Sequence, residues 1–180
     1  MKKIALAVLL ASGLMAADSG NYIGVDVGNT KFDMKASAAG VSAEESDDGG
    51  SFTLKLGHYF DKNSRALISY QNVNVDGGTS YHVGLGYDYL IGNSDLKPFV
   101  GGFVGYGSAE VDDLPELDIS GAVFGAQIGV NYAINENFSA EVGYRYMKSN
   151  MEDTVTVSGV DVKVEIDPIS NWFVGVNYKF

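Results

Sequence analysis

Apolar and polar residues alternate along most of the chain after residue 20. The clearest stretch is "SYHVGLGYDYLI" at 80–91. Its odd positions carry Tyr81, Val83, Leu85, Tyr87, Tyr89 and Ile91, and its even positions are mostly histidine, glycine and aspartate. Neighbouring side chains of a strand point to opposite sides of its sheet, so a period of two predicts a strand with one apolar face.

Seven more segments alternate in the same way, with unequal clarity. They are residues 21–32, 51–60, 65–73, 97–107, 122–134, 138–147 and 171–180. The segment 97–107 is ambiguous, because both of its faces carry glycine and bulky residues. Together with residues 80–91, these segments predict an all-β chain of eight strands.

The connections between these segments alternate in length. Residues 61–64, 92–95 and 134–137 are short turns, whereas 36–50, 108–118 and the region around 150–168 are long and acidic. The turn at 76–79 is a short exception. Such alternation gathers the tight turns at one end of an up-and-down barrel, as in transmembrane barrels with short periplasmic turns and longer extracellular loops. We therefore predict an eight-stranded antiparallel transmembrane β-barrel.

The direction of the apolar face separates a membrane barrel from a soluble secreted one. The polar faces carry glycine together with five charged residues, Asp26, Lys55, Asp88, Glu141 and Arg145. If the large apolar side chains pointed inward, they would overfill an eight-stranded lumen and leave these charges outside. If they point outward they meet lipid, and a closed barrel leaves no unpaired edge in hydrocarbon. The pattern favours the membrane barrel.

Aromatic residues gather at two depths along the strands. The end with short turns carries Tyr87, Tyr89, Tyr132, Phe138, Tyr178 and Phe180, and the other end carries Tyr70, Tyr81, Tyr146 and Trp172. Two aromatic belts around an aliphatic band are typical of the two membrane interfaces.

The first residues have the layout of an export signal. Lys2 and Lys3 precede an apolar run from Ile4 to Ala11, and small residues follow at Ala16 and Ala17. The run is too short to span a bilayer as a helix, so we interpret residues 1–17 as a cleaved signal peptide and residues 18–180 as one barrel domain. One further hairpin is expected in the region around 150–168. The segment "TVTVSGVDVKVEI" alternates on both sides of Ser158-Gly159, which predicts a hairpin with a bulge or break near Pro168.

Charge and cysteine content narrow the function classes. Without Lys2 and Lys3, the chain has 10 basic and 23 acidic residues, a net charge of −13. Such a protein repels phosphate backbones, so we expect no nucleic-acid partner. The chain has no cysteine, which excludes disulfides, a lipid-bearing cysteine and a cysteine-based metal site.

Three stretches resemble a known family. "KPFVGGFVGYG", "FGAQIGVNYAINENFSAEVGYRYM" and "WFVGVNYKF" are similar to the small eight-stranded outer-membrane barrels of the OmpA/OmpX and opacity-protein type. The resemblance implies a Gram-negative outer-membrane protein in contact with lipid and lipopolysaccharide, with loops exposed to host or phage ligands. It also implies that the last strand is the signal that the barrel-assembly machinery reads. The residues of that signal would be Trp172, Val174, Val176, Tyr178 and Phe180.

The five inward charges allow two interpretations. Buried charges persist when they are paired and hydrogen-bonded, so Asp26, Lys55, Asp88, Glu141 and Arg145 are expected to form a network that plugs the lumen. Alternatively, Arg145 exchanges partners near Glu141 and opens a narrow ion channel. Both hypotheses use the same residues, and the sequence leaves them open.

Catalytic and metal chemistry have little support in the sequence. A surface hydrolase would need a serine, a histidine and an acid together near the outer rim, and the chain has only His58 and His82. The acidic loops match no defined calcium-binding spacing, although weak divalent bridging to lipopolysaccharide phosphates is a hypothesis. We expect no enzyme activity, no cofactor and no metal site.

Overall fold

The computed structural model describes residues 19–38, 41–111, 118–157 and 160–180. Nine antiparallel strands make up the regular structure of these residues: β1 (Gly20–Ala38), β2 (Val41–Tyr59), β3 (Ser64–Val75), β4 (Gly78–Leu90), β5 (Leu96–Val111), β6 (Asp118–Ala133), β7 (Phe138–Ser149), β8 (Met151–Val157) and β9 (Val160–Lys179). The described residues contain no helix long and apolar enough to cross a membrane.

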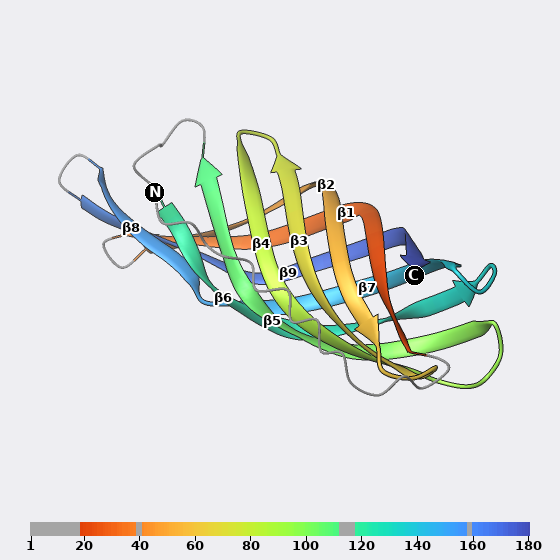
Figure 1. The fold of residues 1–180 in the computed structure, drawn as a ribbon. Helices are drawn as coiled ribbons and strands as arrows, with labels where there is room; N and C mark the ends of the chain where they lie inside the picture. Colours follow the sequence, from red (N-terminus) through yellow and green to blue (C-terminus); the bar gives the residue numbers. More distant parts are fainter. Residues whose placement is uncertain (1–18, 39–40, 112–117, 158–159) are drawn as a thin grey trace, which may run out of the picture.

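Eight of these strands close into a ring, which confirms the predicted barrel. Strands β1 to β7 pair in chain order, β7 pairs with β9, and β9 pairs back with β1 from Tyr22↔Lys179 onward. The tilted, closed ring is visible in Figure 1. Closure pairs every strand of the ring on both sides, which is what a β structure needs in hydrocarbon.

Strand β8 lies outside the ring. It pairs with the first part of β9, as at Asp153↔Val164, and among the described residues it pairs with β6 at Ser120↔Glu152. In Figure 1 this hairpin projects on the left, at the opposite end of the barrel from the C-terminus. The hairpin predicted in this region is confirmed, although Ser158 and Gly159 at its tip lie outside the described residues.

The expected break at Pro168 is confirmed as a bulge in the β1–β9 ladder. Phe32 pairs with Ile169 and Met34 pairs with Ile166, so Asp167 and Pro168 together face the single residue Asp33. Proline has no N–H to give to a ladder, and a bulge is a position that tolerates it.

The short turns are where the alternation placed them, and hydrogen bonds hold them. The Phe60 N–H donates to the Ser64 carbonyl at 3.0 Å, and the Ile134 N–H donates to the Phe138 carbonyl at 2.9 Å. In the third turn Gly92 has φ of +100°, a conformation that glycine adopts without strain.

The prediction of a long loop at 36–50 is wrong. Strand β1 runs to Ala38 and β2 starts at Val41, so most of this acidic segment is a continuous ladder. Opposite charges face each other across it: Lys35 Nζ lies 3.8 Å from Glu44 Oε1. Cross-strand pairs of this kind support strands without apolar residues. Likewise, β5 extends to Val111, while 112–117, including Asp112, Asp113 and Glu116, lie outside the described residues.

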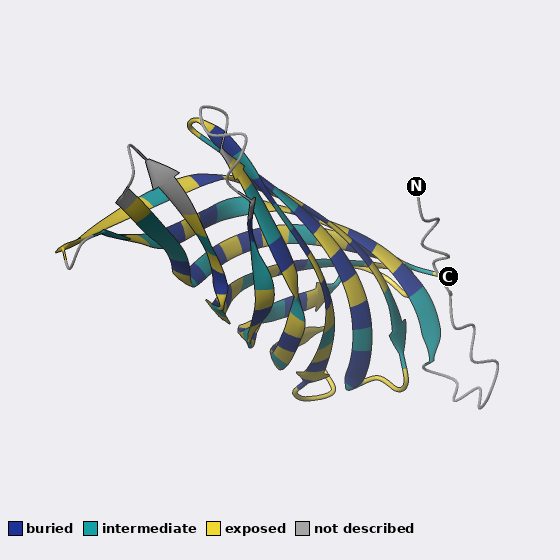
Figure 2. Cartoon of the chain, turned by 90° about the vertical axis from the view of Figure 1, so that its left-hand side faces the viewer, coloured by how far each residue is buried: buried dark blue, intermediate teal, exposed yellow. Residues whose placement is uncertain are grey.

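Burial alternates along the strands, as the bands in Figure 2 show. The aliphatic and aromatic residues predicted to face lipid are largely exposed on the outer wall; Leu85, for example, is 57% exposed. The ambiguous strand is resolved as well: Phe99 and Phe103 point inward, and Val100 and Val104 point outward. Glycine makes room for the inward rings, since a Cβ on Gly84 would lie 2.2 Å from Phe103 Cζ.

Candidate functional site in the barrel lumen

All five charged residues predicted to face the lumen lie inside the barrel. Asp26 comes from β1, Lys55 from β2, Asp88 from β4, and Glu141 and Arg145 from β7, and none of them is more than 6% exposed. Alternation along the strands explains their direction, because each stands between two lipid-facing neighbours.

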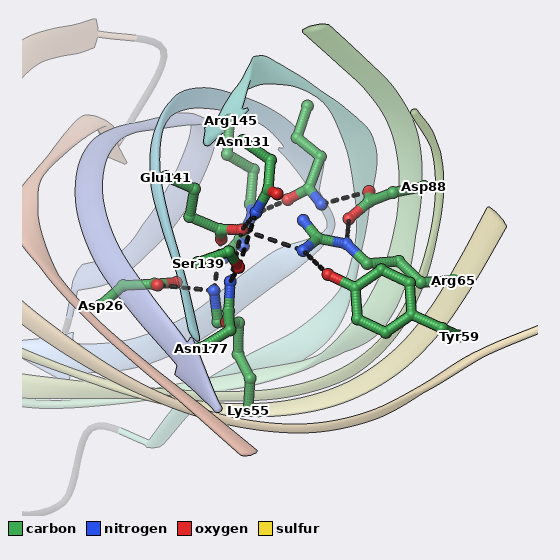
Figure 3. Close-up of polar contacts among 11 residues, drawn as sticks. Asp26, Lys55, Tyr59, Arg65, Asp88, Asn131, Ser139, Glu141, Arg145 and Asn177 are labelled. Carbon is green, nitrogen blue, oxygen red and sulfur yellow. Dashed lines mark hydrogen bonds and ion pairs between the residues drawn. The ribbon is translucent and has the colours of Figure 1, made fainter. Parts of the chain in front are cut away.

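Glu141 is the centre of this group (Figure 3). One of its carboxylate oxygens accepts a hydrogen bond from Lys55 Nζ. The other lies 3.0 Å from Arg65 Nη1 and accepts a bond from Asn177 Nδ2 at 2.9 Å. Asn131 Nδ2 lies at 3.4 Å from the same oxygen. Two cations therefore share one buried carboxylate.

Lys55 and Arg65 each reach a second carboxylate. Lys55 Nζ lies 2.6 Å from Asp26 Oδ1, and Arg65 Nε donates to Asp88 Oδ2 at 2.9 Å. The chain Asp26–Lys55–Glu141–Arg65–Asp88 thus crosses the lumen from β1 to β4 through β7. Buried ions of this kind depend on continuous pairing, because an unpaired ion is costly in a dry interior.

Arg145 joins the group through an amide instead of a carboxylate. Its Nε donates to Gln127 Oε1 at 2.9 Å, and Gln127 Nε2 donates to Asp88 Oδ1 at 2.5 Å. The guanidinium carbon lies 5.3 Å from the ring centroids of Phe103 and Phe173, a cation–π arrangement. Among the described residues Glu141 is thus paired with Lys55 and Arg65, and not with Arg145.

Sequence reasoning missed Arg65 and the amides. Arg65 follows a turn directly, but it shares the parity of Leu67, Ser69 and Gln71, which are all buried. This shared parity indicates that the Arg65 side chain faces the lumen. We call Asp26, Lys55, Arg65, Asp88, Glu141 and Arg145 the charge layer; it contains three cations and three carboxylates, so its formal charge is zero.

A second layer fills the lumen toward the long hairpins. It consists of the buried side chains Phe32, Val73, Phe103, Ile119, Val123, Met147, Met151, Ile166 and Ile169, which we call the apolar layer. Its residues come from seven strands, mostly from the ends of those strands that carry the long connections. The lumen therefore contains a charged and an apolar region in series.

The predicted assembly signal lies on the outer face of the last strand. Trp172, Val174, Val176, Tyr178 and Phe180 are 41–65% exposed, and the Phe180 N–H donates to the Asn21 carbonyl at 2.9 Å. The Tyr178 ring packs 4.9 Å from the Phe138 ring. The residues between them face inward, including Phe173 in the lumen.

The two histidines occupy different environments. His58 is half-buried on the outer wall, with Nδ1 2.9 Å from Asn21 Oδ1. His82 is 2% exposed inside the lumen, and neither ring nitrogen has a hydrogen-bond partner among the described residues. No serine or carboxylate completes a hydrolase-like arrangement around His82 there.

Comparisons with known proteins agree with this architecture. Residues 4–180 match the family described as the outer membrane protein beta-barrel domain. Neisserial surface protein A shares 24% identity at a TM-score of 0.63, with 90% of this chain and 99% of that chain covered. OprG of Pseudomonas aeruginosa shares 18% identity at a TM-score of 0.59, with 91% and 97% covered. OprH of P. aeruginosa shares 21% identity at 0.56, with 89% and 99% covered. No curated protein matches the sequence.

Proposed function

Because the chain belongs to the outer membrane protein beta-barrel family and lies in the bacterial outer membrane, we propose that it is a closed barrel with a structural and surface-interaction role. The observation that carries this proposal is the lumen, in which a charge layer and an apolar layer follow each other. An eight-stranded barrel is just wide enough for its own side chains to fill it.

The two layers oppose ion passage in different ways. In the charge layer, a passing ion would have to displace partners held at hydrogen-bond distances, such as Asp26 and Lys55 at 2.6 Å. In the apolar layer, an ion would have to lose its water, because hydrophobic constrictions exclude water from a pore. Either layer alone hinders a hydrated ion, and together they support a closed lumen.

Solute flux into vesicles tests closure. The protein is refolded into liposomes, with folding checked by the heat-dependent shift of its gel band, and swelling is followed in arabinose. We expect these liposomes to swell at the same rate as liposomes without protein. A rate that rises with the amount of folded protein contradicts the closed barrel.

The surface role is assigned to the hairpins beyond the ring. The β1–β2 and β8–β9 hairpins continue as paired strands, and their outward residues are mostly polar, as with Lys35, Glu44 and Lys163. Host, phage or neighbouring lipopolysaccharide are the partners that such exposed elements would meet. Loops and their ends commonly carry binding functions on a rigid barrel.

Divalent bridging to lipopolysaccharide is the most directly testable of these contacts. The β1–β2 hairpin exposes Glu44, Glu45 and Asp48 on β2, which attract divalent cations. Calorimetric titration of the folded protein with Mg²⁺, with and without lipopolysaccharide, measures it. Saturable heat that requires lipopolysaccharide supports bridging, whereas its absence removes this partner.

A narrow channel is the second candidate, and the sharing of partners favours it. Glu141 is shared by Lys55 and Arg65, and Lys55 is shared by Glu141 and Asp26. Shared ions can exchange partners at little cost, so a rearrangement around Glu141 and Arg145 would be the gate of such a channel. The Lys55–Glu141–Arg65 group supports this gate better than a direct Arg145–Glu141 pair.

The last strand is further proposed to address the chain to the barrel-assembly machinery. Phe180 is 65% exposed and contacts the Tyr178 ring at a centroid distance of 6.3 Å, so it is not required to fill the interior. Phe180→Ala should lower the amount of barrel in the outer membrane of cells while leaving refolding in detergent unchanged. Equal loss in both settings would assign Phe180 to stability.

The signal peptide and the boundary of the barrel domain also remain proposals. Residues 1–17 lie outside the described residues, and β1 starts at Gly20. Mass spectrometry of the protein extracted from outer membranes should give a mature chain that starts near residue 17 or 18. A retained N-terminus contradicts cleavage.

A further inference from the structure

Two buried polar side chains in the lumen have no partner among the described residues. Gln71 and His82 face each other across β3 and β4, and each is 2% exposed. Neither the amide atoms of Gln71 nor the ring nitrogens of His82 make a hydrogen bond there. Buried polar groups are almost always satisfied, so such a pair requires an explanation, for which water or an ion are the usual ones.

A methionine sulfur lies beside His82. All three methionines of the described residues, Met34, Met147 and Met151, lie in the apolar layer or pack against it. Met151 is the methionine that lies beside the imidazole. A Cβ placed on Gly107 would lie 2.8 Å from Met151 Sδ and 3.1 Å from His82 Nε2. The absence of a side chain at Gly107 therefore makes room for both groups, and one imidazole nitrogen and one thioether sulfur lie close to the same point.

An aromatic ring covers one face of the His82 imidazole. Phe32 stacks on it with a centroid distance of 6.2 Å and an interplanar angle of 20°. Stacking favours one plane of the imidazole, and neither ring nitrogen has a hydrogen-bond partner among the described residues. Water would satisfy a nitrogen, but it would make no use of the thioether of Met151 beside it.

We propose that His82 and Met151 bind a soft monovalent metal ion, Cu(I) or its analogue Ag(I), inside the lumen. Thioether sulfur selects soft ions and imidazole also suits copper, whereas hard cations prefer oxygen. Both ligands are neutral and donate lone pairs, so binding releases no proton and requires no redox step. A monovalent ion also suits an apolar site better than a divalent one, because its desolvation costs less.

This site goes beyond the proposed surface role and departs from the expectation of no metal site. The expectation of no metal site rested on the types and spacing of possible ligands along the chain. The sequence alone does not show that Met151 lies beside His82. The hairpin after β7 returns Met151 to the lumen, where it meets a residue from β4.

Metal titration of the refolded barrel tests the proposal. Ag(I) is titrated by calorimetry, and Cu(I) is titrated under reducing, oxygen-free conditions against a chromophoric Cu(I) chelator. Wild-type protein should bind one ion per chain. His82→Leu and Met151→Leu should each weaken binding by more than about tenfold, since even loss of an outer-shell partner costs that much at many sites.

Matched variants separate the site from adventitious binding. Met151→Leu conserves volume and should fold, as checked by the heat-dependent gel shift. His58→Asn changes the other histidine and should bind as wild type does. X-ray absorption of bound Cu(I) should show nitrogen and sulfur neighbours. Absence of saturable binding, unchanged binding in Met151→Leu, or loss in His58→Asn would each overturn the proposal.

Discussion

The charge layer and the apolar layer occupy one continuous lumen, yet they are built by opposite rules. In the charge layer each ion has named partners, and Glu141 alone contacts Lys55, Arg65 and Asn177. The nine side chains of the apolar layer are hydrophobic and need no hydrogen-bond partners. They contribute by packing against one another. The stability of the charge layer depends on every ion having its partners, and the stability of the apolar layer depends on close packing.

This difference teaches how the barrel interior tolerates change. Removal of one partner in the charge layer leaves other ions buried without compensation, whereas trimming of the apolar layer leaves only a small void. Substitutions in the two layers should therefore change the free energy of unfolding by different amounts. Disruption of one layer should leave the other still able to block ions.

The largest effect is expected for Glu141→Leu. The substitution leaves Lys55 and Arg65 as partly uncompensated buried cations, so the free energy of unfolding should fall by about 3–5 kcal/mol. Urea unfolding in detergent, followed by the fluorescence of Trp172, measures this loss. The exposed Glu45→Leu on the β1–β2 hairpin is the control and should change stability little. A loss at Glu141 as small as in the control would refute a pairing-dependent layer.

Two glutamines give a matched pair at the border of the layers. Gln127 bridges Asp88 and Arg145, so Gln127→Leu should cost about 1–3 kcal/mol. Gln71 has no partner for its amide among the described residues, so Gln71→Leu should be neutral or stabilising. The same unfolding assay compares them. Similar destabilisation by both would mean that Gln71 has a partner, such as a bound water.

A smaller effect is expected within the apolar layer. Ile169 is fully buried, and Ile169→Val should cost about 0.5–1.5 kcal/mol through one lost methylene. Ile68 faces lipid at 44% exposure, and the same substitution there should cost less, because lipid fills the space that the side chain leaves. Equal costs at the two positions would contradict close packing of the apolar layer.

The smallest effect is a pH dependence confined to the outer hairpin. Hydrogen bonding to Lys163 lowers the pKa of Glu165, so the ionised carboxylate stabilises the folded hairpin. That contribution is present above the ordinary pKa of 4.5 and is lost as pH falls through the lowered value. The protection factors of the β8 and β9 amides, which are exchange rates corrected for the intrinsic effect of pH, should fall on acidification, and Lys163→Gln should remove much of that change. An unchanged pH response in the variant would exclude the pair as its cause.

The wall of the barrel could be predicted from the sequence because alternation is local. Residues such as Leu85 and Val104 face lipid whatever their distant neighbours are, so their period of two decides their side. The inward direction of Asp26, Lys55, Asp88, Glu141 and Arg145 follows from the same rule.

The partners inside the lumen could not be predicted, because they depend on register among strands that are distant in sequence. Arg65 reaches Glu141 across 76 positions only after closure of the ring, and Met151 reaches His82 only after the outer hairpin forms. The strands in the acidic segment 36–50 could not be predicted either, because the segment shows no alternation of apolar residues. Cross-strand pairs such as Lys35 and Glu44 stabilise these strands instead.

Single-channel conductance of the refolded protein in a planar bilayer tests the central claim most directly. Two barriers in series predict no discrete openings for the wild type. They predict the same for Glu141→Ala and Arg145→Ala, because the apolar layer stays intact in both variants. Discrete openings of the wild type, altered in size or frequency by Glu141→Ala, would contradict the closed barrel and identify the protein as a gated channel.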